Sequence, residues 1–145
     1  MSELSPVVVA VDLGPGLEDL VRRGQRLAHC EEAPLVVVHV VGRDPLAEAV
    51  NHFDYGELLL DELADPALST EERARRLLLP RLIPLGVSES AIEVLAGPPA
   101  RVVSERAERL EARLLVLGSP RSRFGSVAVH AARHAPCDVH IHRQG

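Results

Sequence analysis

The segment PVVVAV at residues 6–11, followed directly by DLGPG at residues 12–16, decides the fold. The β-branched run has no polar position, which is typical of a strand buried on both faces, and the residues that follow it favour a turn. From residue 17 the apolar residues change to helical spacing: Leu17, Leu20, Val21, Gly24, Leu27 and Ala28. Because glycine weakens a helix interior, Gly24 on this apolar face indicates close packing against a sheet. A buried strand followed by an amphipathic helix is the first unit of an α/β protein.

The same alternation continues to the end of the chain. The further expected strands are residues 34–41, 91–95, 114–117 and 139–142. The further expected helices start at residue 69 and span residues 100–110 and 126–134. Strands joined by helices through short links form a parallel sheet that is covered on both faces. The sequence therefore predicts one domain, residues 1–145, built as a doubly wound α/β fold with a five-stranded parallel sheet.

The helix that starts near residue 69 has a recognisable beginning and an uncertain end. Ser69 and Glu72 match a capping box. We expect this helix to turn three apolar residues inward, Ala74, Leu77 and Leu78, and to kink or end at Pro80. The preceding residues 42–68 are the least regular part of the sequence, and we expect a variable connection there without an assigned role.

Composition excludes several classes of function. With 46% apolar and 26% charged residues, a net charge of -5 and scattered arginines, the chain is a folded domain without a nucleic-acid-binding footprint. No apolar stretch is long enough to span a membrane, and no signal peptide is apparent. Cys30 and Cys137 have no CxxC spacing, so we expect reduced thiols in the cytoplasm, both of them small buried residues.

Ligands of doubly wound sheets bind beyond the carboxyl ends of the strands, where Asp12–Gly16, Val40–Arg43 and the loop after Gly118 meet. The Gly14-Pro15-Gly16 turn begins a dinucleotide fingerprint, but Asp19 stands where the third glycine belongs. The second strand also ends without the acidic residue that would bind a ribose. A turn closed by Asp12 explains the glycines equally well, and we therefore disfavour a dinucleotide site.

Metal binding and nucleophilic catalysis have little support. His130 and His134 are four residues apart on a helix, and His140 and His142 share one face of the last strand, but no spacing supplies a third ligand. The chain has no Gly-x-Ser-x-Gly elbow, and neither cysteine has a histidine arrangement that would activate it. We expect no metal and no catalytic residue.

Several segments together resemble the universal stress proteins. They are VVVAVD in the first strand, LVVVHVV in the second, AGPPARVVSERAERLEARLLVLGS in the second half and ARHAPCDVHI near the end. The resemblance covers essentially the whole chain. It implies a Rossmann-like sheet of the adenine nucleotide alpha hydrolase type, a cytoplasmic location and homodimers built through the last strand.

Nucleotide-binding universal stress proteins carry G-x2-G-x9-G-[S/T] after the fourth strand. Here Gly118, Gly125 and Ser126 match its ends, but Arg121 replaces the middle glycine and only residues 119–124 separate the outer two. Pro120 donates no amide, and arginine does not readily take the positive φ values that such a loop uses. The loop thus resembles the universal stress protein A branch, whose members generally do not bind ATP.

The resemblance leaves two functions to compare. The first is a homodimeric stress-response and interaction protein without catalysis or cofactor, acting on unknown protein partners. The alternative is a nucleotide sensor or slow ATPase that binds ATP or AMP with Mg²⁺. In that case Asp12 and Val40 would hold the adenosine, and Gly118, Gly125 and Ser126 the phosphates. Without a nucleotide, the same residues are a strand-end aspartate, a strand valine and a helix cap at Ser126.

The last strand offers a surface for self-association. Val139 and Ile141 alternate with His140 and His142, and we expect this strand at an edge of the sheet. Antiparallel pairing with a second copy would satisfy its open backbone groups. Since protonation of the two histidines would bring like charges together, we expect such a dimer to be sensitive to mild acid.

Overall fold

The computed structural model describes residues 4–42, 67–119 and 125–143 of the chain. Strands alternate with helices from the first element to the last: β1 (Val7–Val11), α1 (Leu17–Cys30), β2 (Leu35–Val41), α4 (Thr70–Leu82), β3 (Ile92–Ala96), α5 (Pro99–Arg109), β4 (Leu114–Gly118), α6 (Gly125–His134) and β5 (Asp138–His142). Two short 3-10 turns, η1 (Ile83–Leu85) and η2 (Glu89–Ala91), join α4 to β3. These elements agree with the predicted ones to within one or two residues at most ends.

The five strands form one parallel sheet in the order β3-β2-β1-β4-β5. The prediction of a doubly wound five-stranded sheet is confirmed, and so is the edge position of the last strand. The chain first moves from β1 toward β3 and then returns past β1 to add β4 and β5. The strand order therefore reverses between β1 and β4, which is where ligands bind in folds of this kind.

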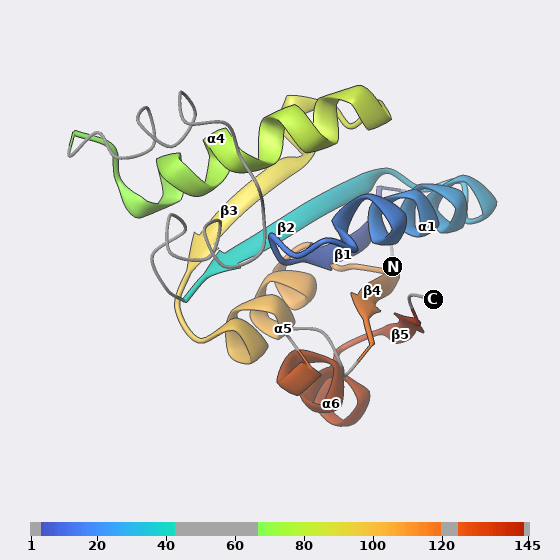
Figure 1. Ribbon diagram of the computed structural model, residues 1–145. Helices are drawn as coiled ribbons and strands as arrows, with labels where there is room; N and C mark the ends of the chain where they lie inside the picture. Colours follow the sequence, from blue (N-terminus) through green and yellow to red (C-terminus); the bar gives the residue numbers. More distant parts are fainter. Residues whose placement is uncertain (1–3, 43–66, 120–124, 144–145) are drawn as a thin grey trace.

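Helices α1 and α4 cover one face of the sheet, and α5 and α6 cover the other (Figure 1). Each face has its own core. The side with α1 and α4 buries Val7, Val9, Val11, Leu17, Leu77, Leu78 and Leu82, and the side with α5 and α6 buries Val8, Val38, Val103, Ala107, Leu115 and Val127. Successive residues of β1 thus contribute to opposite cores, which explains why the strand has no polar position.

The close packing predicted at Gly24 is present. A Cβ atom added to Gly24 would lie 2.2 Å from Cγ2 of Val9 in β1. Only a glycine allows α1 to approach the sheet this closely, which accounts for the break in an otherwise ordinary apolar helix face.

Helix α4 begins as predicted but does not end at Pro80. The capping box is formed: Ser69 Oγ accepts from the Glu72 amide at 3.2 Å, and the Glu72 carboxylate accepts from the Ser69 amide at 3.4 Å. The helix continues past Pro80 to Leu82 and runs directly into η1. Pro80 lacks the amide that would bond to the carbonyl four residues earlier, so the helix loses one hydrogen bond there. The side chain of Pro80 is exposed, and the fully buried Leu78 and Leu82 on either side hold the last turn against the core.

The two cysteines are free, but the expectation that both are buried is wrong for Cys30, which is exposed. Cys30 follows Ala28 by about 200° around α1, so it leaves the apolar face of that helix. Cys137 packs against the core beneath α5 and α6, and burial raises the pKa of its thiol. Among the described residues, no helix is both long enough and apolar enough to cross a membrane.

Candidate functional site

A narrow cavity opens at the carboxyl end of the sheet, at the point where the strand order reverses. It is lined by residues from β1, β2 and β4 and from the starts of α1, α5 and α6: Ala10, Val11, Asp12, Gly16, Leu17, Leu20, Val38, Val40, Pro99, Val103, Leu117, Gly118 and Val127. Three residues predicted for a nucleotide site, Asp12, Val40 and Gly118, therefore come together here. Helix α6 begins at Gly125, so Ser126 lies in its first turn and is not the cap residue that we expected. The five residues of the loop before α6, at 120–124, lie outside the described residues.

The size and lining of this cavity limit what it can hold. Its volume is about 30 Å³ and most of its lining is apolar. That volume accommodates one or two water molecules, whereas sites for drug-sized ligands occupy roughly 300–1,000 Å³. Among the described residues, the enclosed part of the cavity is therefore too small for a nucleoside.

The carboxylate of Asp12 is engaged by its own loop. Oδ1 of Asp12 accepts a hydrogen bond from the Gly14 amide at 2.8 Å, which closes a tight turn after β1. A Cβ at Gly14 would lie 2.7 Å from the same oxygen, so a larger residue there would displace the Asp12 carboxylate from this hydrogen bond. Of the two alternatives for the glycine-rich segment, a dinucleotide site and a turn closed by Asp12, this hydrogen bond supports the turn.

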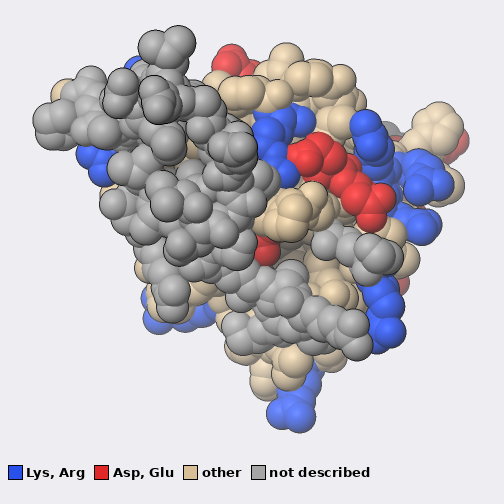
Figure 2. Space-filling model, viewed as in Figure 1, with Lys and Arg blue, Asp and Glu red and all other residues tan. Residues whose placement is uncertain are grey.

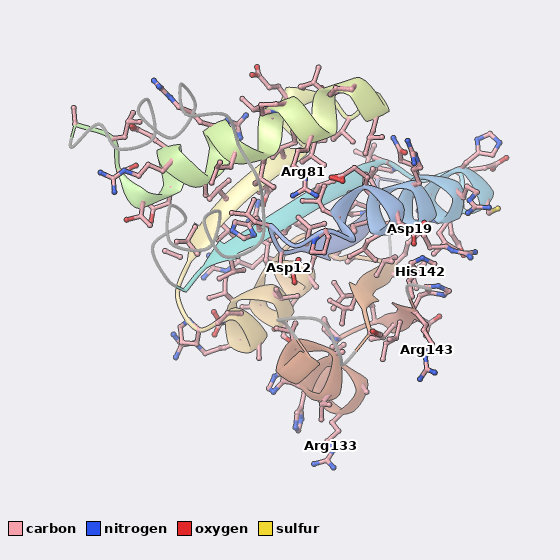
Figure 3. The ribbon with its side chains drawn as sticks, in the orientation of Figure 1. Asp12, Asp19, Arg81, Arg133, His142 and Arg143 are labelled. Carbon is pink, nitrogen blue, oxygen red and sulfur yellow. The ribbon has the colours of Figure 1, made fainter. Side chains whose placement is uncertain are left out.

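Arg81 of α4 holds the other side of this loop, and the sequence analysis did not identify it. Its guanidinium donates to the main-chain carbonyls of Leu13 at 3.0 Å and Gly14 at 2.9 Å, and it forms a two-pronged ion pair with Glu18. Asp12 and Arg81 thus lie on either side of the turn between β1 and α1 (Figure 3). The sequence spacing could have identified Arg81, because it is seven residues after Ala74 and therefore on the buried face of α4. An arginine on that face needs a buried partner.

His39 is the other functional-type residue near this edge, and it is buried to 1% exposure in β2. Its Nδ1 lies 2.8 Å from the carbonyl of Val11, and because a carbonyl only accepts, this nitrogen carries the proton. Burial lowers the pKa of His39, although the Val11 hydrogen bond and the nearby charge of Asp12 oppose that effect. His39 is therefore neutral at physiological pH and links β2 to the end of β1.

Asp19, which occupies the third glycine position of the incomplete dinucleotide fingerprint, points away from the cavity. Its Oδ2 lies 2.8 Å from Nε2 of His142 in β5. The side chain of Asp19 is 59% exposed, so it belongs to the surface and not to a ribose site. The structure therefore supports a turn rather than a dinucleotide-binding loop at residues 14–19.

Four of the described histidines form two pairs. The rings of His130 and His134 lie 4.8 Å apart on α6, and those of His140 and His142 lie 6.4 Å apart and nearly parallel on β5. Within the three described ranges, no three His, Cys, Asp or Glu side chains gather in a way that would hold a metal ion.

Comparison with known proteins identifies the family. The chain matches the model of the Universal stress protein family over residues 3–143. It is 28% identical over 138 residues to Universal stress protein A homolog 1 of Coxiella burnetii (strain RSA 493 / Nine Mile phase I), with 92% of each chain covered. Universal stress protein UspA from Lactobacillus plantarum has a TM-score of 0.63 and 25% identity, with 97% of this chain and 99% of that chain covered. A universal stress protein solved in complex with cAMP has a TM-score of 0.60 and 20% identity, with 99% of this chain and 100% of that chain covered. This chain belongs to the Universal stress protein family.

Proposed function

We propose that this protein is a cytoplasmic, homodimeric stress-response protein that acts by binding other proteins, without catalysis and without holding ATP tightly. The observation that carries this proposal is the cavity of about 30 Å³ at the carboxyl edge, which is about one tenth of the smallest usual ligand site. At this cavity the carboxylate of Asp12 accepts a hydrogen bond from the Gly14 amide, and the guanidinium of Arg81 donates to two carbonyls of the same turn.

The sequence of the loop after β4 supports the same conclusion. Phosphates bind where successive amides and a helix N-terminus point at the anion. The loop between Gly118 and Gly125 is six positions shorter than the nucleotide-binding motif, has Arg121 in place of the middle glycine and loses an amide at Pro120. The charges of Arg121 and Arg123 add little binding energy for a phosphate in water unless backbone amides already point at the anion.

The edge strand β5 supports the dimer. It pairs with β4 alone among the described strands, so the backbone groups of its other edge face outward. Ile141 on this strand is 40% exposed. Antiparallel pairing with a second copy across a two-fold axis would satisfy these groups and cover that side chain.

Calorimetric titration with ATP and Mg²⁺, together with mass spectrometry of the freshly purified protein, tests the nucleotide part of the proposal. We expect no heat of binding at micromolar concentrations and no copurified nucleotide. A dissociation constant near 1 μM, which corresponds to about -8 kcal/mol, would overturn it. As a matched variant, a chain with the full-length glycine loop grafted between Gly118 and Gly125 reports whether the loop alone prevents binding.

A second candidate is a nucleotide sensor or slow ATPase. It is favoured by the convergence of Asp12, Val40 and Gly118 on one cavity and by the similar fold of a universal stress protein in complex with cAMP. If the titration detects ATP or AMP, substitution of Val40 by a bulkier residue should weaken binding, whereas the same change at the exposed Val129 should not.

A further inference from the structure

The free edge of β5 carries a compact group of charged and titratable side chains on the face toward α1. We call this group, Asp19, Arg23, His140 and His142, the edge cluster. Because side chains alternate along a strand, His140 and His142 point toward α1, while Val139 packs into the core beneath α5 and α6. Figure 3 shows Asp19 and His142 facing one another across the gap between α1 and β5.

The edge cluster holds one acidic side chain, Asp19, and three basic ones, Arg23, His140 and His142. Asp19 pairs with His142, so the one carboxylate of the cluster is already engaged. Arg23 follows Asp19 by one helical turn, and its charge acts on His140. Burial, Arg23 and His142 together lower the pKa of His140, in that order of importance. No group in the edge cluster is left to compensate a proton added to His140.

The surroundings of β5 carry more basic groups than acidic ones. The adjoining strand β4 consists of apolar residues and a glycine, and Val116 is the register partner of His140. On the far side of β5, α6 carries His130, Arg133 and His134, and Arg143 follows the strand. Asp138, at the start of β5, lies on the same face of the strand as His140 and carries a negative charge, but its side chain is exposed, so water and salt screen that charge. Figure 2 shows acidic as well as basic groups over the side of the molecule where α1 lies.

Pairing of two copies would bring the edge clusters together. In antiparallel pairing about a two-fold axis, both sheets keep the same face on the same side, and residues opposite each other on that face lie about 5 Å apart at Cβ. The two copies of His140 and Arg23 would therefore lie along one continuous seam.

We propose that the edge cluster makes self-association through β5 acid-labile: a proton on His140 places a further positive charge beside Arg23 and His142 on each copy, and the dimer separates as the pH falls. This inference rests on the proposed dimer and adds a regulation to it. The sign follows from proton linkage, because the dimer favours neutral His140 and the separated copy accepts the proton more easily. Acid therefore shifts the equilibrium toward the separated copies. With two His140 residues per dimer, the dissociation constant rises by at most about a hundredfold per pH unit.

Sedimentation velocity of the full chain at pH 7.5 and pH 5.5, over a range of concentrations, tests the inference. We expect the dissociation constant of the wild type to rise by at least about tenfold at pH 5.5. His140→Gln, which cannot be charged, should form a dimer at both pH values with nearly the same constant. His134→Gln on the exposed end of α6 is the matched control and should respond to pH as the wild type does.

Each other result has a definite meaning. A dimer whose constant is the same at both pH values overturns the acid switch and leaves the dimer standing, whereas a single chain at both pH values removes the proposed dimer itself. An unchanged acid response in His140→Gln also overturns the assignment to this residue. Far-UV circular dichroism at each pH distinguishes separation from unfolding, and unfolding of the wild type before it separates counts against the inference.

Discussion

Replacement of Gly24 by alanine tests how closely α1 is packed on the sheet. The new Cβ would lie 2.2 Å from Cγ2 of Val9, about 1.2 Å closer than an ordinary contact, and Cδ1 of Leu35 at 3.6 Å limits movement to the side. Overpacking by one methyl group costs about 1–3 kcal/mol. Replacing a glycine inside a helix by alanine, in contrast, stabilises the helix by about 0.5–1 kcal/mol. We therefore expect Gly24→Ala to lower the free energy of unfolding by about 1–2 kcal/mol, measured by urea denaturation at one fixed protein concentration.

The double variant Val9→Ala/Gly24→Ala isolates this contact. Val9→Ala alone should cost about 2 kcal/mol, because it removes buried methyl groups from a fully enclosed site. In that background the clash is gone, so Gly24→Ala should be neutral or slightly stabilising, with a coupling of about 2 kcal/mol between the two changes. If Gly24→Ala stabilises the wild-type protein as it would an exposed helix, the packing argument is wrong.

Three further predictions concern the loops and the buried groups. Arg81→Ala should cost about 2–3 kcal/mol in urea denaturation, since it removes the hydrogen bonds from the guanidinium to Glu18 and to the carbonyls of the turn. Arg101→Ala, in the exposed pair with Glu105, should cost less than about 0.5 kcal/mol. Comparable losses in the two variants would contradict this. Burial lowers the pKa of His39, so the unfolded chain takes up a proton more readily than the folded one. The free energy of unfolding should therefore be highest above about pH 6.5 and should fall below it by at most about 1.4 kcal/mol per pH unit. His39→Gln should reduce that slope in denaturation series from pH 7.5 to 5, and an unchanged slope would exclude His39 as its source. Gly86→Ala should cost about 1–2 kcal/mol through its φ of 87° alone, because a Cβ there meets nothing within 4 Å, and Gly86→Asn should cost less.

The fold was predictable because its determinants are local patterns. The β-branched runs define strands buried on both faces, and Gly24 and the Ser69–Glu72 box mark a close contact and a helix start that are both present. The burial of Cys30 was misjudged, and α4 continues two residues past Pro80, because both depend on the place of the residue relative to the core. Pro80 lies near an exposed helix end that buried leucines hold in place, and Cys30 lies just past the apolar face of α1.

The candidate site was only partly predictable, because its residues act through contacts between distant segments. The convergence of Asp12, Val40 and Gly118 followed from topology, since carboxyl ends of parallel strands meet at one edge. The ion pair of Arg81 with Glu18 joins residues 63 positions apart, and the pair of His142 with Asp19 joins residues 123 positions apart. No periodicity within either helix identifies such a partner.

The same two contacts connect the turn between β1 and α1 and the edge strand β5 to one helix, because Glu18 and Asp19 are neighbours in the first turn of α1. A change that loosens α1 should therefore affect both the cavity and the edge strand that we propose as the dimer interface. Gly24→Ala, which pushes α1 away from the sheet, is expected to shift the dissociation constant of the proposed dimer as well as the free energy of unfolding.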